Sequence, residues 1–218
     1  MMQSLKQGMR KLFLKPFQPR NDLLAKSFSE DYAVFQKLKK IFKDKAYGKS
    51  NLRIYHPGCG SDMASIIMFM DAFLDDKTKM VEVICLDNRD FFEGLITQLK
   101  HYAPGAWFSY SNRKDASQVD VYYLNRKIRL IFYLSDANFF VPKEVIEGID
   151  IYFERAFEIF RSGSEPTFRR ILQNVRPNGL IISDYGFSPS EVKGFVKLKK
   201  IPKKFGLYSN LQIWQRKS

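Results

Sequence analysis

From residue 51 onward, short apolar segments of strand length alternate with segments of helix length, and this order constrains the fold more than any other feature. Strands are predicted at 52–56, 81–86, 128–134, 149–153 and 180–183. Helices are predicted between them at 63–74, 91–102, 141–147 and 166–175. Strands that alternate with helices predict an α/β fold, with a mostly parallel Rossmann-like sheet and helices on both of its faces.

Two hairpins are predicted to add antiparallel strands to this sheet. Tyr122–Leu124 are expected to form a hairpin with the long strand at 128–134. Near the C-terminus, residues 195–201 and 207–214 are predicted to form an antiparallel pair. Arg176–Gly179 are predicted to form a turn, because proline, asparagine and glycine follow one another there.

The first fifty residues differ from this pattern. Residues 29–42 place Tyr32, Phe35, Leu38 and Phe42 at helical spacing, and lysines occupy positions 37, 39, 40 and 43. We therefore predict a helical N-terminal extension at 1–50 and one α/β domain at 51–218. The apolar share of 45% in 218 residues is sufficient for one ordinary buried core.

Charge and rare residue types limit the classes of function. The net charge of +13 would attract nucleic acid, an anionic membrane surface or an acidic protein, although the basic residues are spread along the chain and a general preference for lysine explains them equally well. Two cysteines and two histidines predict neither a disulfide framework nor a zinc site. Without a long apolar run or a signal sequence, we expect a cytoplasmic protein with no transmembrane segment.

The ends of the predicted strands carry the residues of chemical interest, because ligands bind at the carboxyl ends of the strands in sheets of this type. The first predicted strand is followed by two glycines, Gly58 and Gly60. Each of the four later strands is followed by a carboxylate, in chain order Asp87, Asp136, Glu154 and Asp184. Glycines at a strand-to-helix turn let a ligand approach the backbone. A carboxylate after the next strand can accept hydrogen bonds from ribose hydroxyls, and it can equally cap the helix that follows.

Several of these segments resemble motifs of the class I S-adenosylmethionine-dependent methyltransferases. They are His56–Ser61, Asp87, Ser135–Ala137, Leu172–Ile182 and the C-terminal hairpin. The resemblance implies S-adenosylmethionine as the cofactor and a methyl acceptor that the sequence leaves unidentified. It implies these cofactor-binding residues: His56, Gly58, Cys59, Gly60, Asp87, Asn88, Asp136 and Ala137. Glu154, Asp184 and Tyr185 are the candidate catalytic residues.

Two positions differ from the family pattern and keep other functions open. His56 stands where the family usually has an acid, and Asp62 where it commonly has a small residue. The alternative is a catalytically inactive, methyltransferase-like module that binds nucleic acid or a protein through a basic surface. Its lysines would be Lys193, Lys197, Lys199, Lys200, Lys203 and Lys204, which can also simply protect a solvated edge hairpin. A nicotinamide dehydrogenase would require a third glycine where the chain has Met63.

Overall fold

The computed structural model describes residues 50–218, except 75–76, 104, 124, 156–164 and 199–211. Nearly all of the predicted N-terminal extension lies outside these residues, so the division into an extension and a domain stays a prediction. Within the described residues, no helix is both long enough and apolar enough to span a membrane.

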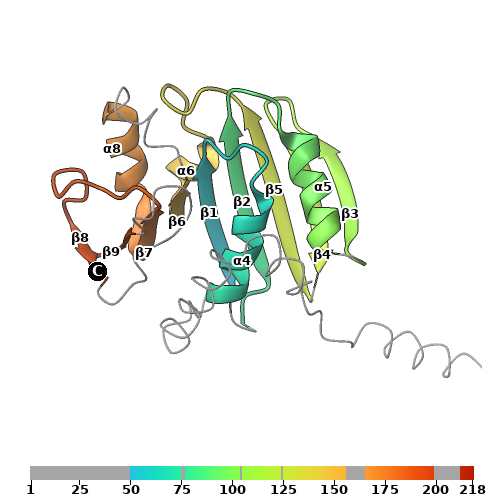
Figure 1. Cartoon of the computed structure of the whole chain (residues 1–218), viewed down its shortest axis with the longest axis horizontal. Helices are drawn as coiled ribbons and strands as arrows, with labels where there is room; N and C mark the ends of the chain where they lie inside the picture. The colour runs from blue at the N-terminus through green and yellow to red at the C-terminus, as the bar shows by residue number, and fades with distance from the viewer. Residues whose placement is uncertain (1–49, 75–76, 104, 124, 156–164, 199–211) are drawn as a thin grey trace, which may run out of the picture.

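Figure 1 shows the strands and helices of the described residues. In chain order they are β1 (Asn51–Pro57), α4 (Met63–Phe73), β2 (Met80–Asp87), α5 (Phe92–Tyr102), β3 (Trp107–Asn112), β4 (Ser117–Tyr123), β5 (Arg126–Leu134), α6 (Lys143–Ile146), β6 (Ile149–Glu154), α8 (Glu165–Gln173), β7 (Val175–Ser183), β8 (Phe195–Lys197) and β9 (Gln212–Arg216). Most of the predicted strands and helices lie within two residues of these bounds, and α6 is a shorter helix than predicted.

The strands form one nine-stranded sheet in the order β3-β4-β5-β2-β1-β6-β7-β9-β8. The five central strands β5, β2, β1, β6 and β7 are parallel. The pairings β3–β4, β4–β5, β7–β9 and β8–β9 are antiparallel. The expectation of a mostly parallel sheet is therefore wrong: half of the eight described pairings are antiparallel, the sheet is mixed, and the described helices are few.

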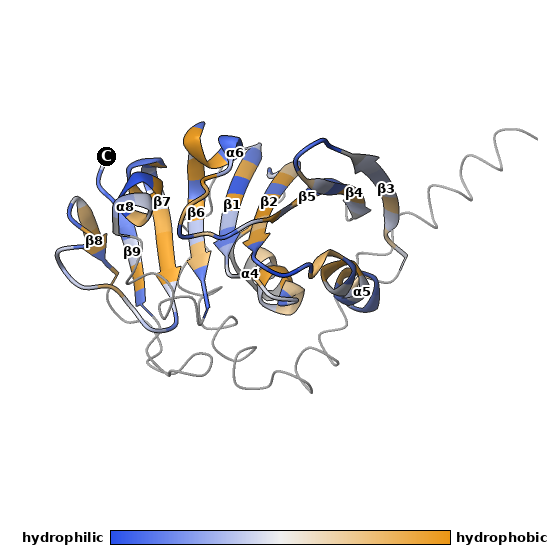
Figure 2. Cartoon of the chain, turned by 90° about the horizontal axis from the view of Figure 1, so that it is seen from above, coloured by the Kyte–Doolittle hydropathy of each residue, from blue (hydrophilic) through white to orange (hydrophobic). Residues whose placement is uncertain are grey.

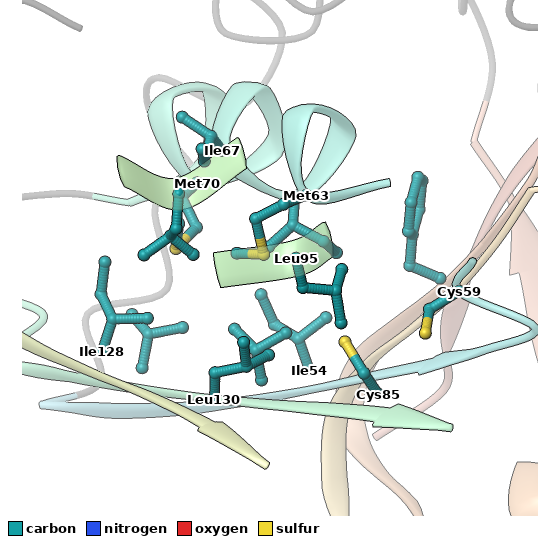
Figure 3. Packing of buried hydrophobic residues seen from close by; sticks show 14 of the residues in the cluster. Ile54, Cys59, Met63, Ile67, Met70, Cys85, Leu95, Ile128 and Leu130 are labelled. Atoms are coloured by element: carbon teal, nitrogen blue, oxygen red, sulfur yellow. The ribbon is translucent and has the colours of Figure 1, made fainter. Parts of the chain in front are cut away.

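Alternation along the strands gives the sheet two apolar faces, each with its own core. On β1, Ile54 packs with α4 and α5, whereas Tyr55 packs on the opposite face with α6 and α8. Figure 2 shows α4 and α5 together on one side of the sheet. In Figure 3, Ile54 and Leu130 of the strands face Met63 and Ile67 of α4. The continuously apolar strands predicted from the sequence thus result from burial on both faces.

The predicted turn at Arg176–Gly179 is part of β7 in the structure. The pairing of β6 with β7 shifts there, because Ile149 pairs with Val175 but Ile151 pairs with Leu180. A side chain at Gly179 would meet backbone oxygens within 2.8 Å, so only glycine fits the irregularity. The turn-forming residues therefore make a bulge within a strand rather than end it.

Candidate functional site

The turn from β1 into α4 holds two glycines in the left-handed region of backbone conformation. Gly58 has a φ of 58° and Gly60 a φ of 50°. No described atom lies within 4 Å of the position that a Cβ at Gly60 would occupy. The turn is tied to the end of β2, because the N–H of Cys59 donates to the carbonyl oxygen of Leu86 at 3.3 Å. The backbone of this turn is therefore open on one side, as close approach by a ligand requires.

Asp87, the last residue of β2, holds this turn in place. Its Oδ2 accepts a hydrogen bond from the N–H of Gly60 at 2.9 Å, and its Oδ1 accepts one from the N–H of Arg89 at 3.2 Å. An ionised carboxylate has about four acceptor positions. The two described bonds therefore leave capacity for hydroxyl donors of a ligand.

The segment after β5 lies beside Asp87. The N–H of Ser135 donates to the carbonyl oxygen of Asp87 at 2.8 Å, which joins the two strand ends. The carboxylate of Asp136 accepts from the N–H of Asn138 at 2.8 Å and so closes its own turn, and Ala137 is buried. The structure thus brings together the glycine turn, Asp87 and the Ser135–Ala137 segment, with Asn88 exposed at the same edge.

His56 is fully buried beneath the turn. Its Nδ1 lies 3.0 Å from the carbonyl oxygen of Phe153, and its ring packs against the ring of that residue. Because a carbonyl only accepts, Nδ1 carries the proton, and Nε2 of the neutral ring is an acceptor. Nε2 has no hydrogen-bond partner among the described residues. Burial is the main cause of a lowered His56 pKa, which favours this neutral form.

Two side chains, Asp62 and Gln98, accept the first N–H groups of α4, and Arg155 holds Asp62 in place. Asp62 caps the helix, accepting the N–H of Ser65 at 3.0 Å. Arg155, just after β6, pairs with Asp62 at 3.3 Å and donates to the hydroxyl of Ser65 at 2.7 Å. Gln98 of α5 accepts the first two N–H groups of α4 through Oε1. Neither Arg155 nor Gln98 was predicted from the sequence. Arg155 directly follows a predicted strand end, which could have marked it, whereas no sequence signal marks Gln98.

The two cysteines lie close together at the turn between β1 and α4. Cys59 and Cys85 are both buried free thiols, one in the turn and one near the end of β2 (Figure 3). A hydrogen bond with Cys85, together with burial, raises the pKa of the Cys59 thiol. Cys59 is therefore a protonated packing residue rather than a nucleophile.

The predicted catalytic residues lie at the ends of β6 and β7. Glu154 is fully buried, and Oε2 accepts a hydrogen bond from the Tyr152 hydroxyl at 2.6 Å. Since alternate residues share a face, Glu154 lies on the side of Tyr152 and α8, opposite to α4. Asp184 is fully buried and Tyr185 is about half exposed. The end of β7 is three strands from Asp87, about 14 Å at the usual strand spacing. The roles of these three residues stay predictions.

The basic patch predicted near the C-terminus is only partly described. Lys199, Lys200, Lys203 and Lys204 lie outside the described residues. Lys197 of β8 lies over the ring of Trp214 at 5.6 Å, and Lys193 is exposed. The described part agrees with a solvated edge hairpin as well as with a binding surface.

Solved structures with the same arrangement are found at low sequence identity. The chain is similar to the N-methyltransferase NodS from Bradyrhizobium japonicum WM9, with a TM-score of 0.50 and 8% identity over 87% of this chain and 96% of that one. It is also similar to the CurJ carbon methyltransferase, with a TM-score of 0.50 and 12% identity over 86% of this chain and 54% of that one. The chain has a class I methyltransferase fold.

In this fold the closing antiparallel strands β8 and β9 lie beside the last parallel strand, β7, as the sequence led us to expect. Comparison of the sequence with protein families and with curated proteins finds no match. At these identities the likeness establishes the methyltransferase fold, and the function has to be argued from the site.

Proposed function

We propose that the chain binds S-adenosylmethionine at the carboxyl ends of β1, β2 and β5 and transfers its methyl group to an acceptor. One observation carries this proposal: the open backbone at Gly60 lies in hydrogen-bond contact with the carboxylate of Asp87. Tight glycine turns with an acid at the next strand end are suited to a nucleoside whose ribose meets the acid. Similarity in fold to two methyltransferases supports the same cofactor.

Each part of the site has a separate task in this proposal. The remaining acceptor positions of Asp87, supported by Asn88, take the ribose hydroxyls, and the backbone of Asp136 and Ala137 borders the adenine. Gly58, Cys59 and Gly60 border the methionine part, and Nε2 of His56 offers an acceptor beneath it. The cofactor supplies an activated methyl group on a sulfonium. The protein contributes mainly alignment of that group with the acceptor.

The acceptor is contacted from the ends of β6 and β7 in this proposal. Glu154 accepts the hydrogen bond of the Tyr152 hydroxyl, so its side chain is held in one position and would help to shape the acceptor site. Tyr185 is exposed at the end of β7 and offers a hydroxyl to the acceptor. Asp184 remains a candidate for a general base, which is needed only for an acceptor that is a poor nucleophile.

Calorimetric titration with S-adenosylhomocysteine tests the proposal. Wild-type protein should bind it, and Asp87→Ala should weaken binding roughly tenfold or more, because charge-assisted hydrogen bonds contribute about 1.5–3 kcal/mol. Asp87→Asn keeps one of the two carboxylate oxygens as an acceptor for the turn and should lose less. Glu93→Ala, at an exposed carboxylate in the first turn of α5, is the matched control and should bind like the wild type.

Failure of the wild-type protein to bind S-adenosylhomocysteine and S-adenosylmethionine would overturn methyl transfer. The inactive binding module with a basic surface would then be the remaining function for this fold.

A further inference from the structure

A row of side chains crosses four strands at the amino end of β5. The register pairs Met80 with Lys127, Lys127 with Tyr122, and Tyr122 with Trp107. Paired residues on neighbouring strands project to the same face of a sheet. The Trp107 and Tyr122 ring centroids are 5.4 Å apart, and the Lys127 ammonium lies 5.7 Å from the Tyr122 centroid. Two aromatic rings and a cation thus stand side by side.

This row is exposed to solvent. Trp107 is 65% exposed and Tyr122 is 44% exposed, although both are large apolar side chains. Lys127 lies on the same face as Ile131, which packs in the core opposite to α4 and α5. Val121 and Phe108, the neighbours of Tyr122 and Trp107, pack in the core on the side of α5, so the two rings project to the opposite side of the sheet. Figure 2 shows α5 on one side of β3 and β4 and no described helix on the other side of these two strands. Neighbouring exposed aromatic residues on a flat sheet face indicate a binding surface.

Cations continue from the row along the same edge. Lys77, Lys79 and Arg126 lie at the beginnings of β2 and β5, and the two lysines are exposed. The N–H of Lys127 donates to the carbonyl oxygen of Lys79 at 2.9 Å, and Nε of Arg126 donates to that of Thr78 at 3.1 Å. These bonds keep the cationic residues of the two strands next to each other.

The acids in the neighbouring row are already neutralised. Asp120 of β4 is bound by Nε of Arg129 at 2.9 Å and by the Lys127 ammonium at 2.6 Å. Glu82 of β2 lies in the same row, 3.9 Å from Arg129, so Arg129 and Lys127 balance the charges of Asp120 and Glu82. The positive charge of the surface therefore comes from the exposed Lys77 and Lys79.

We propose that this face, formed by Trp107, Tyr122 and Lys127 with the exposed Lys77 and Lys79 beside them, binds single-stranded nucleic acid. Exposed rings give unpaired bases a surface on which to stack, and lysine and arginine side chains attract the phosphates. A sheet face with adjacent aromatic rings is a common platform for single strands.

This surface is distinct from the proposed methyl-transfer site. Lys127 is near the amino end of β5 and Leu134 ends the strand, so the row and the Ser135–Ala137 segment lie about 25 Å apart along the strand at its usual rise per residue. The two proposals can therefore fail independently.

Fluorescence anisotropy with labelled oligothymidylate and oligouridylate of about twenty nucleotides tests this inference, a length that spans several stacking positions. Wild-type protein should bind at least one of the two. Trp107→Ala and Tyr122→Ala should each weaken binding roughly fivefold or more, whereas Trp107→Phe, which keeps a ring, should lose less. Phe139→Ala is the matched control, because Phe139 is 84% exposed at the opposite edge and should not change the affinity.

The salt dependence of the affinity tests the contribution of the charged residues. The logarithm of the affinity should fall linearly with the logarithm of salt concentration, and Lys79→Gln should reduce the slope by about 0.7, the value of one phosphate contact on a single strand. Lys143→Gln, which removes an exposed lysine of α6, should leave the slope unchanged.

Intrinsic fluorescence provides a direct test of stacking. The chain has two tryptophans, so in Trp214→Phe the emission comes from Trp107 alone and should be quenched by the oligonucleotide. The inference is overturned if neither oligonucleotide binds, or if they bind equally well to Trp107→Ala and Tyr122→Ala with unchanged melting temperatures. Binding to phosphatidylserine vesicles without binding to oligonucleotides would overturn it as well.

Discussion

At the scale of single residues, His56 shows how burial sets the chemistry of the candidate site. Nδ1 must donate to the carbonyl oxygen of Phe153, and burial lowers the His56 pKa from its usual 6.5. The native protein therefore keeps this ring neutral at a pH where the unfolded chain protonates it. Below about pH 6.5 the unfolded state binds the additional proton, so the free energy of unfolding decreases as the pH falls.

Urea denaturation at about pH 7.5 and about pH 5.5 measures this effect. His56 should account for a loss of up to about 1.4 kcal/mol of wild-type stability between the two conditions. His56→Gln, which does not titrate, should lose correspondingly less between them. His101→Gln removes the other histidine, which is exposed, and is the matched control. An equal loss of stability in His56→Gln and wild type would show that the ring is protonated in the native protein.

At the scale of elements, the start of α4 depends on a side chain from α5. Oε1 of Gln98 accepts the N–H groups of Met63 and Ala64, at 3.0 and 3.1 Å. Gln98→Ala removes the acceptor of the Ala64 N–H, whereas the Met63 N–H keeps the carbonyl oxygen of Ser61 at 2.9 Å, so the free energy of unfolding should fall by about 1–2 kcal/mol. Gln98→Glu keeps the acceptor oxygens and adds a charge that the helix N-terminus favours, so it should lose less. Thr97→Ala, at an exposed neighbouring position, is the control. If Gln98→Ala were no less stable than Thr97→Ala, the contact between these helices would have no stabilising role.

The same elements show what the sequence could and could not predict. Strands such as β2 were predictable because burial on both faces makes them continuously apolar. β3 was missed, because its Trp107 and Tyr110 are exposed and its serines interrupt any apolar run. Glycines and acids at strand ends could be located from the order of elements alone. Contacts such as that of Gln98 depend on tertiary packing of two helices, which no local pattern encodes.

At the scale of the whole molecule, the mixed sheet has two edges with different chemistry. The carboxyl edge gathers the open turn at Gly60 and the carboxylate of Asp87. The amino end of β5 and its neighbours β4 and β3 gather exposed rings and cations. Strands such as β2, which is hydrogen-bonded to β1 on one side and to β5 on the other, run from one edge to the other. The two edges are therefore joined by a rigid sheet and not by a hinge.

Each of the two ligands should therefore slow amide hydrogen exchange at a different edge of the sheet. S-adenosylhomocysteine should slow exchange at 58–62, 87–89 and 135–138, because binding there suppresses local opening of the turns. An oligonucleotide should slow exchange in β3 and β4 and leave the carboxyl edge unchanged, since about 25 Å of paired strand lies between the two sites. Mass spectrometry of peptides from both edges, with each ligand alone and with both together, distinguishes the two patterns. Slower exchange at 58–62 on addition of the oligonucleotide would contradict two separate sites, because it would place the nucleic acid at the edge that we assign to the methyl donor.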